Sequence, residues 1–94
     1  MKRCSKITVK GKIQGVSYRD FVKKHAQKLE IEGTVQNSDE GTVIINVCGS
    51  SDKLEDFIDL LYQGPPKAKV EEVREEPISH GRDFRGVFRI IGSG

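Results

Sequence analysis

The sequence lacks the features that would point to a membrane segment, a metal site or a polyanion-binding surface. Its longest apolar runs are only a few residues, as at 43–45, and its first residues, MKRCSKI, contain no apolar signal region. The two cysteines and two histidines show no zinc-site spacing. The 16 basic and 14 acidic residues are interspersed, so the net charge of +2 creates no broad field for nucleic acid or an acidic membrane. We therefore expect a cytoplasmic protein without cofactor, metal, membrane or nucleic-acid partner.

The chain length limits the size of any binding site. The 94 residues predict one domain, 1–94, with no internal repeat or linker. A chain of this size buries roughly 60–65% of its unfolded surface, enough for one core but not for a cavity around a large cofactor. The ligand should be small or bound at the surface, and we expect a monomer.

The N-terminal third predicts a strand followed by an amphipathic helix. Ile7 and Val9 alternate with polar residues, which is typical of a strand with one exposed face. A helix is predicted over 19–30 because apolar and aromatic residues recur there at helical spacing. These residues are Val22, His25, Ala26 and Leu29. On this stripe His25 is expected to pack rather than to act as a base.

The middle of the chain predicts a hairpin and a second helix. Segments 33–37 and 42–48 are rich in strand-forming residues and are separated by turn residues. Ser51 and Asp52 are candidate caps for the second helix, which the Gly-Pro-Pro sequence at 64–66 ends.

The C-terminal third predicts two more strands. Segment 70–76 is polar and acidic, as at a sheet edge, and segment 84–91 provides a last strand that closes a C-terminal hairpin. The element order is that of a ferredoxin-like α+β sandwich. In this fold an antiparallel sheet has both helices on one face, the first strand lies between the third and fourth, and the other face is exposed.

The segment that joins the first strand to the first helix, GKIQGVSYR at 11–19, predicts an anion-binding loop. Two glycines permit tight turns, and main-chain N–H groups at the start of a helix have no helical acceptor. These groups belong to Gln14, Gly15, Val16, Ser17, Tyr18 and Arg19. A cation at Arg19 is unexpected, because the first helical turn favours Asp or Glu. A phosphate would satisfy the N–H groups and the guanidinium together, whereas the simpler alternative is an ion pair between Arg19 and Asp20.

The predicted topology places the two cysteines close together. Cys4 and Cys48 are at even positions, whereas the apolar positions of their strands are odd. The start of the first strand should lie opposite the end of the third, which places both thiols on the open face within reach of a disulfide. Reduced thiols are the default in the cytosol, so both states remain open. Neither cysteine has a histidine placed for catalysis.

Two separated motifs resemble those of the acylphosphatases. GKIQGVSYR at 11–19 matches the family signature G-x-V-Q-G-V-x-[FY]-R, and VQN with EGTV over 35–43 resembles V-x-N-x-x-D-G-[TS]-V at the family's spacing. The resemblance follows the element order of the whole chain. It implies a small ferredoxin-like enzyme that hydrolyses acyl phosphates to a carboxylate and inorganic phosphate without a metal. By matching position, Arg19 would bind the phosphoryl group and Asn37 would hold the attacking water, with phosphate or sulfate as competing anions.

The chain departs from the family pattern at three positions. Glu30 stands where a helix-ending glycine is frequent, Thr34 where tryptophan is frequent, and Glu40 where aspartate is usual. None of these changes affects Arg19 or Asn37. They bear on stability and on the geometry of the second strand.

The chemistry that the resemblance implies fits the residue types present. The leaving carboxylate has a pKa near ~4 and needs little help from a general acid. Phosphoryl transfer needs positive charge at the equatorial oxygens and an in-line water, which a loop, an arginine and an amide can supply. For Asn37 the alternative role is that of a turn residue at a strand end.

Two other functions remain open at this point. One is a non-catalytic module that binds acyl phosphate, carbamoyl phosphate or phosphate, as in the larger carbamoyl-transfer proteins of hydrogenase maturation. The other is an RNA-recognition module, which shares the ferredoxin-like fold and stacks bases on aromatic residues of the open face. The inner strands here offer no such aromatic residues.

Overall fold

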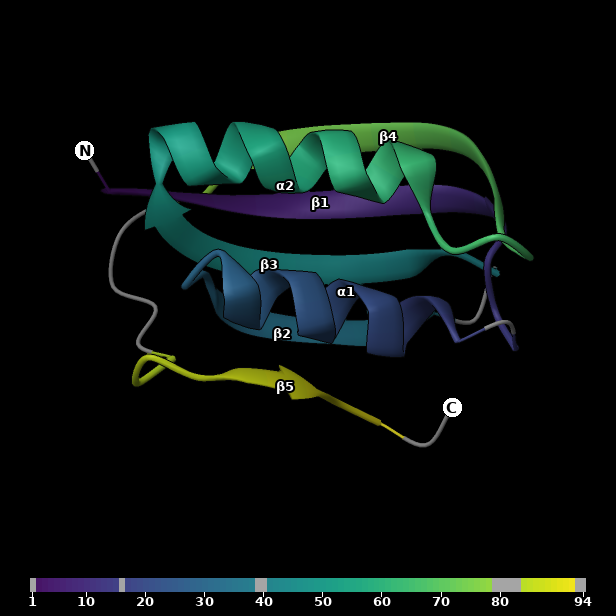
Figure 1. Ribbon diagram of the computed structural model, residues 1–94, viewed down its shortest axis with the longest axis horizontal. Helices are drawn as coiled ribbons and strands as arrows, with labels where there is room; N and C mark the ends of the chain where they lie inside the picture. The colour runs from purple at the N-terminus through teal and green to yellow at the C-terminus, as the bar shows by residue number, and fades with distance from the viewer. Residues whose placement is uncertain (1, 16, 39–40, 79–83, 93–94) are drawn as a thin grey trace.

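The chain folds into one sheet with two helices on one of its faces (Figure 1). The computed structural model describes residues 2–15, 17–38, 41–78 and 84–92. The elements in chain order are β1 (Lys2–Lys12), α1 (Tyr18–Lys28), β2 (Glu32–Asn37), β3 (Val43–Ser50), α2 (Ser51–Gln63), β4 (Lys69–Pro77) and β5 (Phe88–Ile90). The sheet order is β4-β1-β3-β2-β5, so β1 lies between β3 and β4. The predicted ferredoxin-like α+β sandwich is thereby confirmed.

The C-terminal strand lies elsewhere than expected. The predicted hairpin between segments 70–76 and 84–91 is wrong, because β4 pairs with β1 at one edge and β5 pairs with β2 at the other. The β2–β5 pair is parallel, so the sheet is mixed rather than fully antiparallel. Apolar packing explains the position of β5. Phe88 is buried in the core, with its ring centroid 6.4 Å from that of Phe57, and β5 packs against α1 at this edge.

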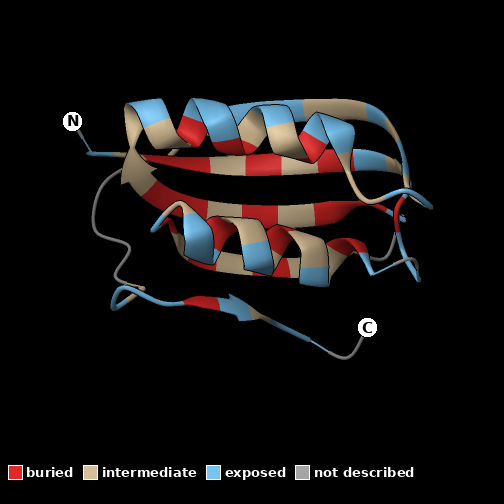
Figure 2. Cartoon of the chain, viewed as in Figure 1, coloured by how far each residue is buried: buried red, intermediate tan, exposed pale blue. Residues whose placement is uncertain are grey.

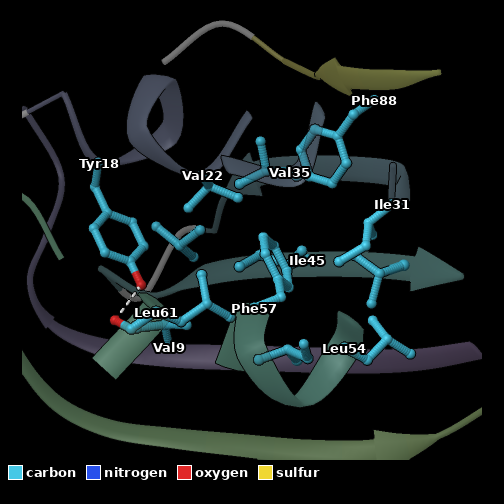
Figure 3. Close-up of a cluster of buried hydrophobic side chains, with 14 of the residues drawn as sticks. Val9, Tyr18, Val22, Ile31, Val35, Ile45, Leu54, Phe57, Leu61 and Phe88 are labelled. Atoms are coloured by element: carbon cyan, nitrogen blue, oxygen red, sulfur yellow. Dashed lines mark hydrogen bonds between the residues drawn. The ribbon is translucent and has the colours of Figure 1, made fainter. Parts of the chain in front are cut away.

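The core lies between the sheet and the helices. Buried residues alternate with more exposed ones along the central strands (Figure 2). Odd-numbered residues of β1, β2 and β3 face the helices, and Figure 3 shows their side chains converging with those of α1 and α2. The largest fully buried side chains are those of Tyr18, Phe57, Ile7, Ile13, Ile45, Leu54 and Leu61.

The helix ends differ in detail from the sequence prediction. Helix α1 ends at Lys28, and Glu30 then takes a left-handed conformation (φ 58°), as a glycine would at this turn. The Glu30 carboxylate accepts a hydrogen bond from Lys53 Nζ at 2.7 Å. The predicted caps of α2 are wrong, because Ser51 and Asp52 are already helical. Ser50, whose backbone is extended, accepts instead from the main-chain N–H of Lys53.

The cysteines lie opposite each other, as the topology predicts. Cys4 pairs with Cys48 in the β1–β3 register, and their Cα atoms are 4.1 Å apart. A disulfide with an S–S distance of 2.00 Å joins the two residues. Both are buried, near the start of β1 and away from the connection that leads from β1 into α1 (Figure 1).

Tyr18 connects the two helices. Its hydroxyl donates a hydrogen bond of 2.9 Å to the carbonyl of Leu61, in the last turn of α2 (Figure 3). Carbonyls in the last turn of a helix lack helical donors, so the phenol satisfies one of them inside the core. Burial raises the pKa of the Tyr18 phenol above its ordinary value, so the hydroxyl stays protonated and keeps donating.

We expect Tyr18→Phe to lower the free energy of unfolding by about 1–3 kcal/mol, because it leaves a buried carbonyl without a donor. Tyr62→Phe is the matched control. The Tyr62 side chain is exposed, and its hydroxyl makes only a 3.4 Å contact with the Val73 carbonyl. Urea unfolding of both variants measures the difference. Equal losses in the two variants would show that the Tyr18–Leu61 bond contributes nothing of its own.

Candidate functional site

A bulge at the end of β1 leads into residues 14–19, the segment predicted to bind an anion and called the anion-binding loop below. The register between β1 and β4 shifts between Lys10 and Gly11. A Cβ atom at Gly11 would lie 2.1 Å from the carbonyl oxygen of Lys69, so only glycine fits there. Beyond it, Gly15 and Ser17 both have a positive φ, of 75° and 62°. These two left-handed residues turn the chain from the sheet into α1.

The start of α1 leaves main-chain donors available. Ser17 is the N-cap, but its side chain makes no capping hydrogen bond. The first helical bond is donated by Phe21 N–H to the Ser17 carbonyl at 3.0 Å. The N–H groups before Phe21 therefore have no acceptor within the helix. Such groups, together with the positive end of the helix, are suited to hold an anion.

Arg19 lines a cavity at this helix start. The cavity has a volume of about 380 Å³ and is lined by Ile13, Gly15, Ser17, Tyr18, Arg19, Asp20 and Ile90. The ion pair between Arg19 and Asp20 that the sequence left open does not form, and the structure describes both residues. The guanidinium thus contributes the positive charge of this cavity, whereas Ile13 and Ile90 form an apolar wall.

Asn37 is the last residue of β2 and lies at the same end of the sheet. It pairs with Val43, which in turn lies opposite Val9 in β1. Alternation from the buried Val35 places the Asn37 side chain on the face that the helices cover. Figure 1 shows that the C-terminal end of β2 and the connection from β1 to α1 are at one end of the molecule. The Oδ1 atom of Asn37 is buried and accepts no hydrogen bond within the described part of the chain.

The structure groups the predicted site residues in two sets. Gly15, Ser17, Tyr18 and Arg19 line the cavity, whereas Gln14 and Asn37 are not among its lining residues. Val16 lies outside the described residues, as does the departure at Glu40.

Sequence reasoning missed one contact between these sets. It gave Gln14 only a main-chain role, but the Gln14 side-chain amide donates to the carbonyls of Ser38 and Thr42. These two residues follow β2 and precede β3, so Gln14 ties the anion-binding loop to the strand end that carries Asn37. The glutamine of the GxxQG pattern was visible in the sequence, but its partners were not.

His25 does not line the cavity. His25 packs on Phe21 with ring centroids 4.4 Å apart, as the helical pattern predicted. Burial, followed by the charges of Lys28 and Lys24, lowers the pKa of His25 and favours the neutral ring. His80 lies outside the described residues.

The part of the chain that the structure describes shows neither a metal-binding cluster nor a membrane span. Among residues 2–15, 17–38, 41–78 and 84–92, no three His, Cys, Asp or Glu side chains are grouped to hold a metal ion. Within the same ranges, neither helix has the length and apolar character needed to cross a membrane.

Comparisons with known proteins agree with this geometry. The acylphosphatase family model matches residues 5–90. An acylphosphatase of Caldivirga maquilingensis is 40% identical over 82 residues, which cover 86% of either chain. The acylphosphatase structure from Coxiella burnetii superposes with a TM-score of 0.89 at 37% identity, covering 96% of this chain and 93% of that one. The structure of acylphosphatase from Bacillus subtilis also has a TM-score of 0.89, at 32% identity, with 98% and 100% covered.

The two structures share the fold over nearly the whole of both chains. The motifs at 11–19 and 35–43 lie within the region that the family model matches. The chain therefore belongs to the acylphosphatase family and is an enzyme that hydrolyses acyl phosphates.

Proposed function

We propose that the enzyme hydrolyses small acyl phosphates by in-line attack of a water molecule, with Arg19 and the anion-binding loop holding the phosphoryl group and Asn37 holding the water. The reaction breaks the bond between phosphorus and the carboxyl oxygen. The products are a carboxylate and inorganic phosphate. The positive charge comes from the protein itself, and no metal is required.

Two features of the loop support the binding of a phosphoryl group. The main-chain donors at the start of α1 are not used by a cap, and Arg19 has no partner in Asp20. A guanidinium can donate two parallel hydrogen bonds to phosphoryl oxygens. Charge develops on these oxygens in the transition state, so preorganised donors lower the barrier without having to reorient.

The buried oxygen of Asn37 is the observation that carries the proposal. A buried acceptor without a donor costs about 1–3 kcal/mol, so its persistence calls for an explanation. A water molecule that donates to Oδ1 satisfies the acceptor and has its lone pair free to attack. The amide NH₂ of the same side chain can donate in addition. The end of β2, which carries Asn37, lies at the same end of the molecule as the connection from β1 to α1 (Figure 1), which supports this role.

The leaving group makes an acid catalyst unnecessary. A carboxylate with a pKa near ~4 departs as an anion at neutral pH. The neutral His25, which lies in the helix and not on the cavity wall, is therefore not needed for proton transfer. The apolar wall of Ile13 and Ile90 and the small volume favour short acyl groups.

The same anion site should bind free inorganic phosphate and sulfate as competitors. We also infer that the enzyme is a cytoplasmic monomer. The balanced surface charge and the absence of inner-strand aromatic residues on the open face disfavour RNA as a partner. A non-catalytic phosphate-binding module is disfavoured by the family's activity, and turnover of an acyl phosphate separates the two functions directly.

Hydrolysis should survive exhaustive chelation. We expect unchanged kcat and KM for acetyl or benzoyl phosphate after dialysis against EDTA, because Arg19 and main-chain dipoles supply the charge that a metal would otherwise provide. The assay is phosphate release before and after chelation, in metal-free buffer. Loss of activity that Mg²⁺ or Zn²⁺ restores would overturn the metal-independent mechanism.

Arg19→Lys should impair both substrate binding and turnover. The ammonium of lysine keeps the charge but loses the planar two-point contact with phosphoryl oxygens. We expect kcat/KM to fall by about a hundredfold or more, with weaker inhibition by phosphate. Lys23→Arg, on the same helix and outside the cavity lining, is the matched control. Parental activity in Arg19→Lys would show that the guanidinium does not hold the phosphoryl group.

Asn37→Ala should separate binding from chemistry. Loss of one positioned dipole typically costs on the order of 3 kcal/mol in the barrier, about a hundredfold or more in kcat. The inhibition constant of inorganic phosphate should stay near the parental value, because Arg19 and the loop are intact. Circular dichroism verifies the fold. Parental turnover, or lost phosphate binding in a folded variant, would exclude Asn37 as the water-holding residue.

A further inference from the structure

The side chain of Gln14 spans the gap between the two parts of the site. Its Nε2 atom donates to the Ser38 carbonyl at 3.2 Å and to the Thr42 carbonyl at 3.1 Å. An amide NH₂ group has two hydrogens, so both are used. The two acceptors flank the turn between β2 and β3, immediately after Asn37.

Gln14 adds to the hydrogen bonding of Ser38 and Thr42, the two residues that flank this turn. The Thr42 carbonyl also accepts from the main-chain N–H of Ser38 at 2.8 Å, and the Ser38 carbonyl accepts from Gly41 N–H at 3.4 Å. Each of the two carbonyls therefore has one main-chain donor and one donor from Gln14, which matches its two lone pairs. The hydroxyls of Ser38 and Thr42 are hydrogen-bonded to each other as well. Gln14 thereby attaches Ser38 and Thr42 to the loop.

The Gln14 side chain connects the loop that is proposed to hold the phosphoryl group with the strand end that carries Asn37. Gln14 is followed by Gly15 and Ser17, which line the cavity with Arg19. Asn37 is covalently bonded to Ser38, whose carbonyl Gln14 holds. The connection therefore fixes the distance between the phosphoryl site and the proposed water site. In-line attack depends on that distance, and a shift of about 1 Å can cost about a hundredfold in rate.

We propose that Gln14 is a positioning residue for hydrolysis, which acts through Asn37 by holding the β2–β3 turn against the anion-binding loop. This inference rests on the proposed roles of Arg19 and Asn37. The side-chain donors of Gln14 bind the turn and leave none for a phosphoryl group. Its effect should appear in kcat, whereas phosphate affinity, which depends on Arg19 and the loop, should be kept.

A double-mutant cycle tests this coupling. In the parent background we expect Gln14→Ala to lower kcat by about tenfold, with the inhibition constant of inorganic phosphate changed by less than about twofold. In the Asn37→Ala background the same substitution should lower kcat by less than about twofold, because the group that Gln14 positions is already gone. Gln14→Met keeps the length of the side chain without its donors and should behave as Gln14→Ala does.

Ser50→Ala is the matched control, because it removes the side-chain oxygen that accepts a hydrogen bond from a main-chain N–H at the other end of β3. It should lower the midpoint of thermal unfolding without changing kcat at a temperature where the protein is folded. If Gln14→Ala and Gln14→Met do the same, Gln14 is merely structural and the inference is wrong. Losses that multiply fully with Asn37→Ala would also overturn it.

Failure of the inference can be told from failure of the proposed function. If Asn37→Ala retains parental kcat, the water-holding role itself is wrong. If Asn37→Ala loses kcat but Gln14→Ala and Gln14→Met do not, the proposed function stands and only the positioning role of Gln14 falls.

Discussion

The register of β1, β3 and β2 is the constraint on which the site depends. Ile7, Ile45 and Val35 lie opposite one another in one buried row across the three strands. Two residues further along, the same register brings Asn37 into line with the other strands on the helix-covered face. A slip of one residue in β2 would expose Val35 and turn Asn37 to the open face. The burial of the apolar core thus also determines on which face of the sheet the Asn37 amide lies.

Much of this fold could be predicted from short-range patterns. Alternation at Ile7 and Val9 reports a strand with one buried face, and helical spacing around Val22 and Phe57 reports the two helices. The even positions of Cys4 and Cys48 sufficed to place them opposite each other once the topology was assumed. The loop and Arg19 were predicted to form an anion site because a cation at a helix start conflicts with ordinary helix chemistry, and this assignment stays a prediction.

What the sequence could not provide are contacts between distant segments. The pattern of β5 identifies a strand but not the edge that it joins, which is the edge at β2, where β5 packs against α1. The hydrogen bond from Tyr18 to the Leu61 carbonyl joins residues 43 positions apart, and the sequence around neither residue predicts it. The reach of Gln14 to the β2–β3 turn is of the same kind. Such polar contacts satisfy main-chain groups, whose positions become known only when the chain is folded.

The disulfide between Cys4 and Cys48 closes a covalent ring across 44 positions of sequence. This ring contains the anion-binding loop, α1 and β2, whereas α2, β4 and β5 lie outside it. In the chain-entropy account, a closed loop of this length restricts the unfolded state by about 4 kcal/mol. The ring has a second consequence, for a chain cut by a protease. A single break inside it leaves both pieces bonded through sulfur, so Arg19 and Asn37 stay on one molecule even where the main chain between them is severed.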